Sequence, residues 1–288
     1  MAMEFFRPDN LDDALAILKE KENCKILAGG TDLAIELNER KIKPDQILDI
    51  TGIGCLKKIE EREAVLHIGA AATFDHILRS ALVAKYCPAL SFAASQVGAV
   101  QIRNVATIGG NVANAAAAAD CVPPLMCAGA MAAIKSIRGT RVVAVSDVVV
   151  GAGKNSLEKD EIIVEFLFSA KPGYAMVFEK LGRRKALAIA RINLAVCAKL
   201  ENGVVSDIAV VVGAVGLTAY RVSEVEQFLV GKHLEADVIE QASKMMDETV
   251  ARNLAGRSTT PYKRKIAYAV LKRALKRLVG GEGACGLG

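Results

Sequence analysis

Two pairs of adjacent glycines are the residues of this sequence that most directly suggest chemistry. The first pair lies in LAGGTDL, residues 27–33, and the second lies in VATIGGNVAN, residues 105–114. Glycine adopts positive φ angles and has no side chain to block a ligand. Where such a loop follows a strand and opens a helix, its N–H groups face outward and the helix dipole favours an anion. One pair alone is most often a simple turn, but two similar pairs suggest a dinucleotide whose diphosphate is held from both sides.

Polar side chains beside both pairs would add hydrogen bonds to such a ligand. Thr31 supplies a hydroxyl donor, and Thr107 and Asn111 supply side-chain hydrogen bonds next to Gly109 and Gly110. Asp32 would repel a phosphate, so we expect it either to contact ribose hydroxyls or to cap the helix that follows.

Other kinds of site find little support in the sequence. The seven cysteines are scattered singly, and none belongs to a CxxC pair, so we expect no zinc or iron–sulfur site held by this chain. The three histidines lie far apart as well. Neither a G-x-S-x-G nor an H-E-x-x-H motif is found, and no residue is assigned a catalytic role.

The composition is that of an ordinary globular protein. The chain has 288 residues, of which 52% are apolar, enough for two compact domains. Its net charge of +5, from 37 basic and 32 acidic residues, is too small to predict nucleic-acid binding. The N-terminus lacks the pattern of a signal peptide, and the most apolar segment, residues 208–220, is too short to span a bilayer. We therefore expect a soluble, cytoplasmic protein.

Periodicity predicts the elements that must position the first glycine pair. Asn10 precedes an apolar stripe of helical spacing and predicts a capped helix. Strands over residues 25–29 and 46–50, with a short helix between them, complete a small β-α-β-α-β unit. A second unit begins with a strand over residues 65–70 and a helix that Thr73 caps.

The second glycine pair lies within this second unit. Helices are predicted near residues 89–98 and 121–128. Apolar runs after them predict strands of a mixed sheet, namely AMAAIKSI, RVVAVSDVVV and EIIVEFLF. The main domain boundary is predicted near Pro172.

Beyond that boundary, two apolar runs flank Asn202 and Gly203, a strong signal for a β-hairpin. Three helices follow, and the last has Thr260 as its predicted N-cap and Pro261 at its first position. This last helix carries seven Lys or Arg residues between 263 and 277. They could form a nucleic-acid or membrane patch, but we favour an amphipathic helix that docks while its charges stay in water.

The same motifs resemble a known family. KILAGGTDL, QIRNVATIGGNVANAAAAAD, DEIIVEF and FEKLGRRKALAIA are similar in order and spacing to the FAD-binding subunits of molybdenum hydroxylases, which include xanthine, nicotinate and carbon monoxide dehydrogenases. The resemblance implies an α+β fold with a two-part FAD-binding domain of the vanillyl-alcohol-oxidase type over residues 1–172. Its subdomains would cover residues 1–54 and 55–172, and a smaller α+β domain, an antiparallel sheet with helices, would cover residues 173–288.

The resemblance also implies which residues hold FAD. Residues 25–32 would wrap its diphosphate on one side and residues 106–111 on the other. Asp120 would reach the ribose region, Ile163 would pack near the flavin ring, and Lys180 would balance charge at the ring edge. Their ordinary alternatives are a helix cap, a core strand residue and a solvated lysine. The implied cofactor-binding set is Lys25, Ile26, Leu27, Ala28, Gly29, Gly30, Thr31, Asp32, Ala106, Thr107, Ile108, Gly109, Gly110, Asn111, Asp120, Ile163 and Lys180.

Two departures refine this expectation. The first loop holds no histidine, so we expect FAD to bind without a covalent link. Val97 stands where some relatives place an aromatic residue before the second motif, so stacking on the flavin ring is not expected there.

By resemblance, the chain is one subunit of a hydroxylase or dehydrogenase complex. A large subunit would carry molybdopterin, a small subunit would carry 2Fe-2S clusters, and FAD on this chain would pass electrons to NAD⁺ or another small acceptor. A purine such as xanthine, or another N-heterocycle, is the expected substrate. Arg183, Arg184 and Lys185 form a basic cluster that would steer an anionic acceptor, or simply a charged surface. The alternatives are a free-standing flavin oxidase of the same fold and a basic adaptor protein without flavin.

Overall fold

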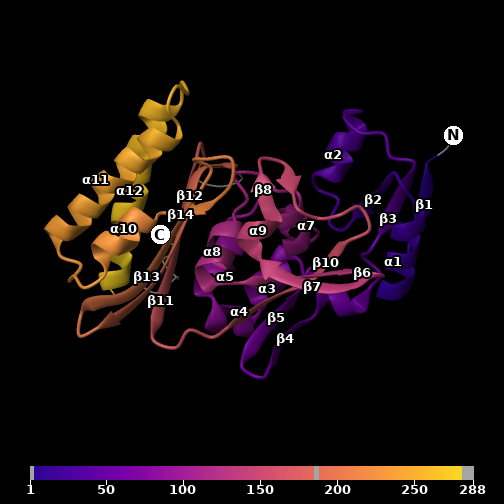
Figure 1. Ribbon diagram of the computed structural model, residues 1–288, viewed down its shortest axis with the longest axis horizontal. Coiled ribbons are helices and arrows are strands. Elements are labelled where there is room, and N and C mark those ends of the chain that lie inside the picture. Colours follow the sequence, from indigo (N-terminus) through magenta and orange to yellow (C-terminus); the bar gives the residue numbers. More distant parts are fainter. Residues whose placement is uncertain (1–2, 185–187, 281–288) are drawn as a thin grey trace.

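The protein is built from three parts that follow one another along the molecule. The computed structural model describes residues 3–184 and 188–280, and in Figure 1 the N-terminal part, the central part and the C-terminal part lie side by side in chain order. The expected α+β class is confirmed, since sheets and helices are combined in each part. No helix in these two ranges is both long and apolar enough to cross a bilayer.

The N-terminal part is the predicted β-α-β-α-β unit. Its elements are β1 (Glu4–Phe6), α1 (Leu11–Glu20), β2 (Cys24–Leu27), α2 (Leu33–Asn38) and β3 (Gln46–Asp49). The three strands are parallel, in the order β1-β3-β2. The Asn10 side chain accepts a hydrogen bond from the backbone N of Asp13 at 2.9 Å, which confirms the predicted cap. The glycine loop therefore follows the carboxyl end of β2.

The central part places a layer of short helices on one antiparallel sheet. Its strands are β4 (Ile59–Arg62), β5 (Val65–Gly69), β6 (Met131–Ser136), β7 (Gly139–Ala144) and β10 (Ile162–Ser169), with a small pair formed by β8 (Val149–Gly151) and β9 (Lys154–Asn155). Its helices are η1 (Gly54–Lys57), α3 (Phe74–Arg79), α4 (Ala81–Tyr86), α5 (Pro88–Ser95), α6 (Val100–Arg103), α7 (Ile108–Ala113), α8 (Val122–Ala128) and α9 (Val145–Val148). The helix cap at Thr73 is confirmed, because its hydroxyl accepts from the backbone N of His76.

Two predictions for this sheet are wrong. The sheet is antiparallel throughout, in the order β4-β5-β10-β6-β7, and is not mixed. Tight hairpins join β4 to β5 and β6 to β7, and such short connections can only produce antiparallel neighbours. The run RVVAVSDVVV is not one strand either, because α9 interrupts it where Val145 and Val148 turn into the core.

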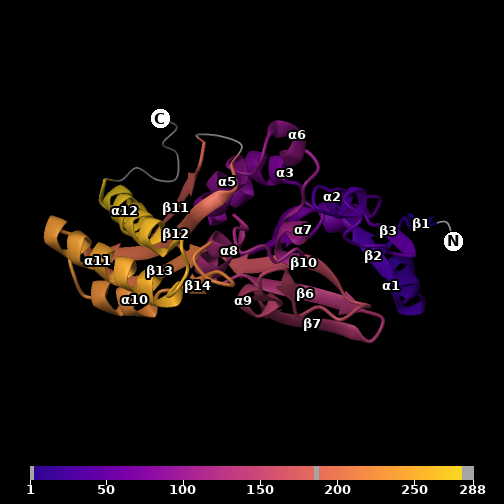
Figure 2. The same cartoon turned by 90° about the horizontal axis from the view of Figure 1, so that it is seen from above.

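The C-terminal part is an antiparallel sheet covered on both faces. Its elements are β11 (Tyr174–Gly182), β12 (Ala190–Glu201), β13 (Val204–Gly213), β14 (Tyr220–Arg221), α10 (Ser223–Leu229), α11 (Ala236–Asn253) and α12 (Thr260–Val279). Figures 1 and 2 show α10 to α12 on its outer face, while α5 and α8 of the central part lie against the other. The predicted hairpin is confirmed, with φ of 53° at Asn202 and 80° at Gly203. One face of this sheet therefore belongs to the central core.

The last helix docks as an amphipathic helix. Val270 and Leu278 are buried, and Ile266 packs against the same cluster. Several of its charges are neutralised within the chain, by the ion pairs Arg264–Asp247, Lys272–Glu240, Arg273–Glu179 and Arg277–Glu179. The predicted N-cap is wrong by one residue, because Thr259 occupies the cap and the Thr260 hydroxyl bonds to the carbonyl of Leu254.

Candidate cofactor site

A cleft of about 580 Å³ opens where the N-terminal and central parts meet the start of the C-terminal sheet. Both glycine motifs lie on it, although Gly29 and Ala106 are 77 positions apart in the chain. The predicted residues that line it are Ile26, Ala28, Gly29, Gly30, Thr31, Asp32, Ala106, Thr107, Gly109, Gly110, Asn111, Asp120, Ile163 and Lys180. The fold thus brings distant segments of the chain together around one cleft.

Three predicted residues do not line the cleft. Lys25 and Leu27 flank Ile26 in β2, and side chains alternate along a strand, so only Ile26 of the three faces the cleft. Ile108 is fully buried in the central core. Any contact of these three residues with a ligand in the cleft would have to be made by the backbone.

Two of the four glycines serve close packing between segments. A Cβ atom on Gly29 would lie 2.3 Å from the carbonyl oxygen of Val105, and one on Gly109 would lie 2.6 Å from that of Ala70. These contacts correct the expectation that each missing side chain makes room for a ligand. Gly30 has a φ of +70°, which glycine adopts without strain. Gly110 is different, because a Cβ there would approach only the Thr107 hydroxyl, at 3.0 Å.

The N–H groups of the second motif are already used within the protein. Ile108 N donates to the carbonyl of Ala72 at 3.1 Å, and Gly109 N donates to that of Ala70 at 2.8 Å. Gly110 N donates to the Thr107 hydroxyl at 3.1 Å, so this side chain caps α7. The Asn111 side-chain oxygen accepts from Cys121 N at 3.4 Å. The prediction of outward-facing N–H groups is therefore wrong for this motif.

The first motif behaves differently. Within the described ranges, the backbone N–H groups of Gly29, Gly30, Thr31 and Asp32 have no hydrogen-bond acceptor. Asp32 does not cap α2 with its side chain, which instead accepts a hydrogen bond from Asn114 Nδ2 at 3.2 Å. Because unpaired N–H groups are costly unless water or a ligand satisfies them, four successive ones on a cleft form a suitable site for an anion.

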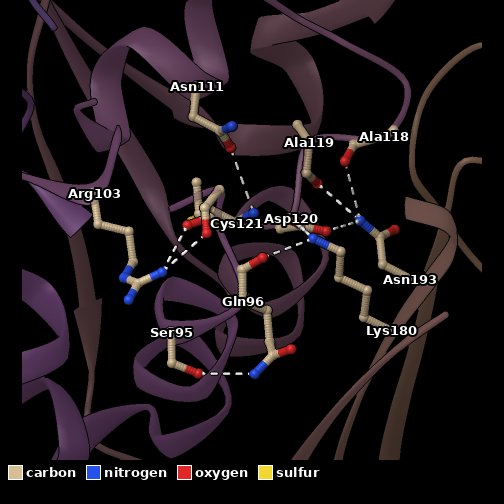
Figure 3. Close-up of polar contacts among 12 residues, drawn as sticks. Ser95, Gln96, Arg103, Asn111, Ala118, Ala119, Asp120, Cys121, Lys180 and Asn193 are labelled. Atoms are coloured by element: carbon tan, nitrogen blue, oxygen red, sulfur yellow. Dashed lines mark hydrogen bonds and ion pairs between the residues drawn. The ribbon is translucent and has the colours of Figure 1, made fainter. Parts of the chain in front are cut away.

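A buried ion pair, Lys180–Asp120, also lines the cleft (Figure 3). Lys180 Nζ lies 2.5 Å from Asp120 Oδ2 and donates to the carbonyl of Gln96 at 2.8 Å. Burial raises the pKa of Asp120, and the ammonium of Lys180 opposes that shift. Among the described residues that line the cleft, Lys180 is the only one with a cationic side chain. Asp120 is therefore not an ordinary helix cap, and Lys180 is not a solvated lysine.

Several residues of the cleft were not among the predicted site residues. Ile102, Glu161 and residues 188–190 lie within the family motifs but were given no role, and Gly98 lies outside those motifs. Val97 lines the cleft as well. Arg103 Nη1 donates hydrogen bonds to the carbonyls of Val97 and Gly98, at 3.2 and 3.0 Å. No group of acidic, cysteine or histidine residues suited to a metal ion occurs in the described part of the chain.

Glu161 is fixed by a two-point ion pair beside the cleft. Its two carboxylate oxygens accept from Arg141 Nε and Nη2, both at 2.8 Å, and Oε2 also accepts from Glu158 N at 2.9 Å. The Arg141 hydrogen bonds lower the pKa of Glu161 below its ordinary 4.5. A carboxyl whose pKa is lowered by folding stabilises the protein above its unfolded pKa, and this stabilisation is lost as pH falls through the folded pKa.

We expect Glu161→Gln to lower the free energy of unfolding by about 2 kcal/mol at pH 7, because two charge-assisted hydrogen bonds are lost. The difference from the wild type should shrink as pH falls below 4.5, where the wild-type carboxyl becomes protonated. Urea denaturation from pH 7 to pH 3 measures this. An equal difference across that range would show that the charge of Glu161 contributes nothing.

Comparison with known proteins decides the family. Residues 1–168 match the family model described as the FAD binding domain in molybdopterin dehydrogenase, and residues 177–278 match the CO dehydrogenase flavoprotein C-terminal domain. The chain belongs to the FAD-binding subunits of molybdenum hydroxylases. The family resemblance seen in the sequence motifs is confirmed, as is the expectation of a two-part FAD domain followed by a C-terminal domain.

Relatives of this FAD-binding subunit match it nearly end to end. It is 34% identical to the nicotinate dehydrogenase FAD-subunit of Eubacterium barkeri, with 98% of each chain covered. It is 32% identical to the xanthine dehydrogenase FAD-binding subunit of Escherichia coli O157:H7, with 97% of each covered. Carbon monoxide dehydrogenase from Hydrogenophaga pseudoflava has a similar structure, with a TM-score of 0.91 at 27% identity, covering 97% of this chain and 98% of that one.

Proposed function

We propose that this subunit binds FAD in the cleft and passes electrons from an iron–sulfur subunit to NAD⁺ or another small acceptor. The observation that carries the proposal is the row of four unpartnered N–H groups at residues 29–32, which suits a diphosphate. Gly110 also lines the cleft, and a Cβ there would meet no atom within 4 Å except the Thr107 hydroxyl, at 3.0 Å. The residues present therefore fit this cofactor.

Within the cleft, residues 28–32 would hold the diphosphate, and Gly110 would admit it. Asp120, Ile163 and Lys180 would bind the rest of the molecule, with the 106–111 segment forming one wall. FAD supplies the redox chemistry, and the protein supplies binding, charge and the exclusion of water. No histidine or cysteine occurs among the described residues that line the cleft, which supports non-covalent attachment.

We further propose the partners, the domain bounds and the substrate class of this subunit. A molybdenum-binding large subunit and a 2Fe-2S small subunit would be its partners in a cytoplasmic complex. Residues 1–172 would form the FAD domain and residues 173–288 the C-terminal domain. The substrate would be a purine or another N-heterocycle, since relatives are named for xanthine and for nicotinate.

Anaerobic reduction of the assembled complex tests this function. Xanthine or nicotinate is added without an acceptor, and the visible flavin absorbance should be lost, then restored by NAD⁺. A flavin that is reduced by dithionite but by neither substrate would contradict the proposed substrate class. Turnover of either substrate by this chain alone would favour the alternative, a free-standing flavin oxidase.

The acceptor would be guided by the basic cluster after β11. Arg183 and Arg184 follow Lys180 closely, whereas Lys185 lies outside the described residues. We expect Arg183→Gln with Arg184→Gln to raise the KM for NAD⁺ about fivefold at low salt and to have less effect at high salt, because screening removes long-range attraction. Steady-state assays of the complex at two ionic strengths measure this. An unchanged KM and salt dependence would exclude the steering role.

A further inference from the structure

One side chain of the C-terminal sheet does not line the cleft but binds a residue that does. Asn193 lies in β12, is fully buried, and is the direct cross-strand partner of Lys180 in β11. Cross-strand partners project from the same face of a sheet. Both side chains bind one carboxylate, since Lys180 Nζ contacts Oδ2 of Asp120 and Asn193 Nδ2 donates to Oδ1 at 2.9 Å (Figure 3).

The amide of Asn193 also holds the backbone next to Asp120. Its Nδ2 lies 3.3 Å from the carbonyl oxygen of Ala119 and 3.4 Å from that of Ala118. These two residues and Asp120 line the cleft, whereas Asn193 does not. Three acceptors on one cleft-lining turn are therefore held by a single donor group from the other domain.

The neighbouring strand is shaped to accommodate this side chain. Gly213 of β13 is the cross-strand partner of Asn193 on its other side. A Cβ atom on Gly213 would lie 2.2 Å from Asn193 Oδ1, so any other residue would displace the amide. Asn193 Oδ1 itself has no hydrogen-bond partner in the described structure. Because an unpaired buried oxygen costs free energy, the bonds of Nδ2 must outweigh that cost.

We propose that Asn193 is a positioning residue of the cofactor site, which holds Asp120 in place against Lys180. The inference rests on the proposed function, because it assigns the purpose of this contact to FAD binding. A charge pair positions a ligand well only when its own side chains are held by further hydrogen bonds. Asn193 provides these bonds from β12, so the C-terminal sheet completes the FAD site through both Lys180 and Asn193.

Asn193→Ala in the full chain should weaken FAD binding about tenfold, because it removes a hydrogen bond to a charged group. Gly213→Ala should weaken it in the same way, since the added methyl displaces the amide. The matched control is Ser243→Ala in α11, which also removes a fully buried hydrogen bond, from Oγ to the Ile239 carbonyl at 2.7 Å. The control should lower the melting temperature and leave the FAD dissociation constant unchanged. Fluorescence titration of the apoprotein with FAD measures the constants.

A double-mutant cycle separates positioning from packing. Because Asn193 is proposed to act through Asp120, Asn193→Ala should weaken FAD binding much less in an Asp120→Ala background than in the wild type. Asn193→Ala with wild-type affinity, or an equal loss of affinity in both backgrounds, would overturn the positioning role. A wild-type chain that takes up no FAD would instead overturn the proposed function, and this inference with it.

Discussion

Replacing Asp120 with Asn is expected to raise the midpoint potential of the bound FAD, and replacing Lys180 with Met is expected to lower it. Reduced flavin carries more negative charge than oxidised flavin, so a cation in the cleft favours the reduced form. Lys180 is the only cation among the described residues of the cleft lining, and Asp120 partly neutralises it. The Asp120→Asn shift should be about 30–70 mV, as expected for one uncompensated unit charge on the cleft lining at an effective dielectric constant near 20. The Lys180→Met shift should be smaller, because protonation of Asp120 leaves the net charge of the pair at zero.

The state of Asp120 explains why the two signs differ. In Lys180→Met, Asp120 loses the ammonium that lowers its pKa, and burial then favours its protonated form. That variant therefore lacks the cation without gaining a buried anion. In Asp120→Asn, Lys180 still donates a hydrogen bond to the carbonyl of Gln96 but has lost the negative charge of Asp120. The positive electrostatic potential in the cleft therefore increases.

Spectroelectrochemical titration of the flavin in each variant measures these shifts. The matched control is Lys199→Met, which removes another lysine of the same sheet that pairs with an acid, Glu201, outside the cleft. The control should leave the midpoint potential unchanged. Shifts of one sign in both cleft variants, or an equal shift in the control, would contradict the role of this pair.

Gly29→Ala and Gly110→Leu are both expected to abolish FAD retention, but for different reasons. The Gly29 methyl would lie 2.3 Å from the carbonyl oxygen of Val105, so the two motifs must separate. Such overpacking should cost about 1–3 kcal/mol of stability, and FAD retention should be lost with it. Gly110→Leu should cost less stability, because a new Cβ would meet only the Thr107 hydroxyl, at 3.0 Å, yet its side chain would enter the cleft and abolish FAD retention.

Urea denaturation of the apoproteins and the flavin content of the purified chains measure the two effects separately. Gly54→Leu is the matched control, since no atom lies within 4 Å of a Cβ built there and the residue is not on the cleft. It should retain both stability and flavin. Full flavin content in Gly110→Leu would contradict the proposed position of the cofactor.

Local patterns predicted the elements whose cause is local. Asn10, Thr73 and the Asn202–Gly203 turn determine their own caps and hairpin through bonds to residues close in sequence, so they could be read without tertiary structure. The two glycine motifs were also recognisable. The sequence did not show that the two motifs use their N–H groups differently. The N–H groups of the second motif donate to the carbonyls of Ala70 and Ala72, which belong to another segment.

The contacts of Asp120 could not be predicted from sequence patterns. The contacts of Asp120 with Lys180 and Asn193 join residues 60 and 73 positions apart. Neither partner belongs to a periodic pattern that indicates which side chain faces Asp120. The strand register supplies this information, since it pairs Lys180 with Asn193 and Asn193 with Gly213. Register between distant strands is set by the whole fold and not by any one segment.

The most direct test of the cofactor site is the visible absorbance spectrum of the purified chain, followed by heat release of whatever it binds. We expect the bands of oxidised flavin in the native protein and free FAD in the supernatant after denaturation, as non-covalent binding in the cleft requires. A colourless chain that also fails to take up added FAD would contradict this, and the unpartnered N–H groups of residues 29–32 would then require another ligand.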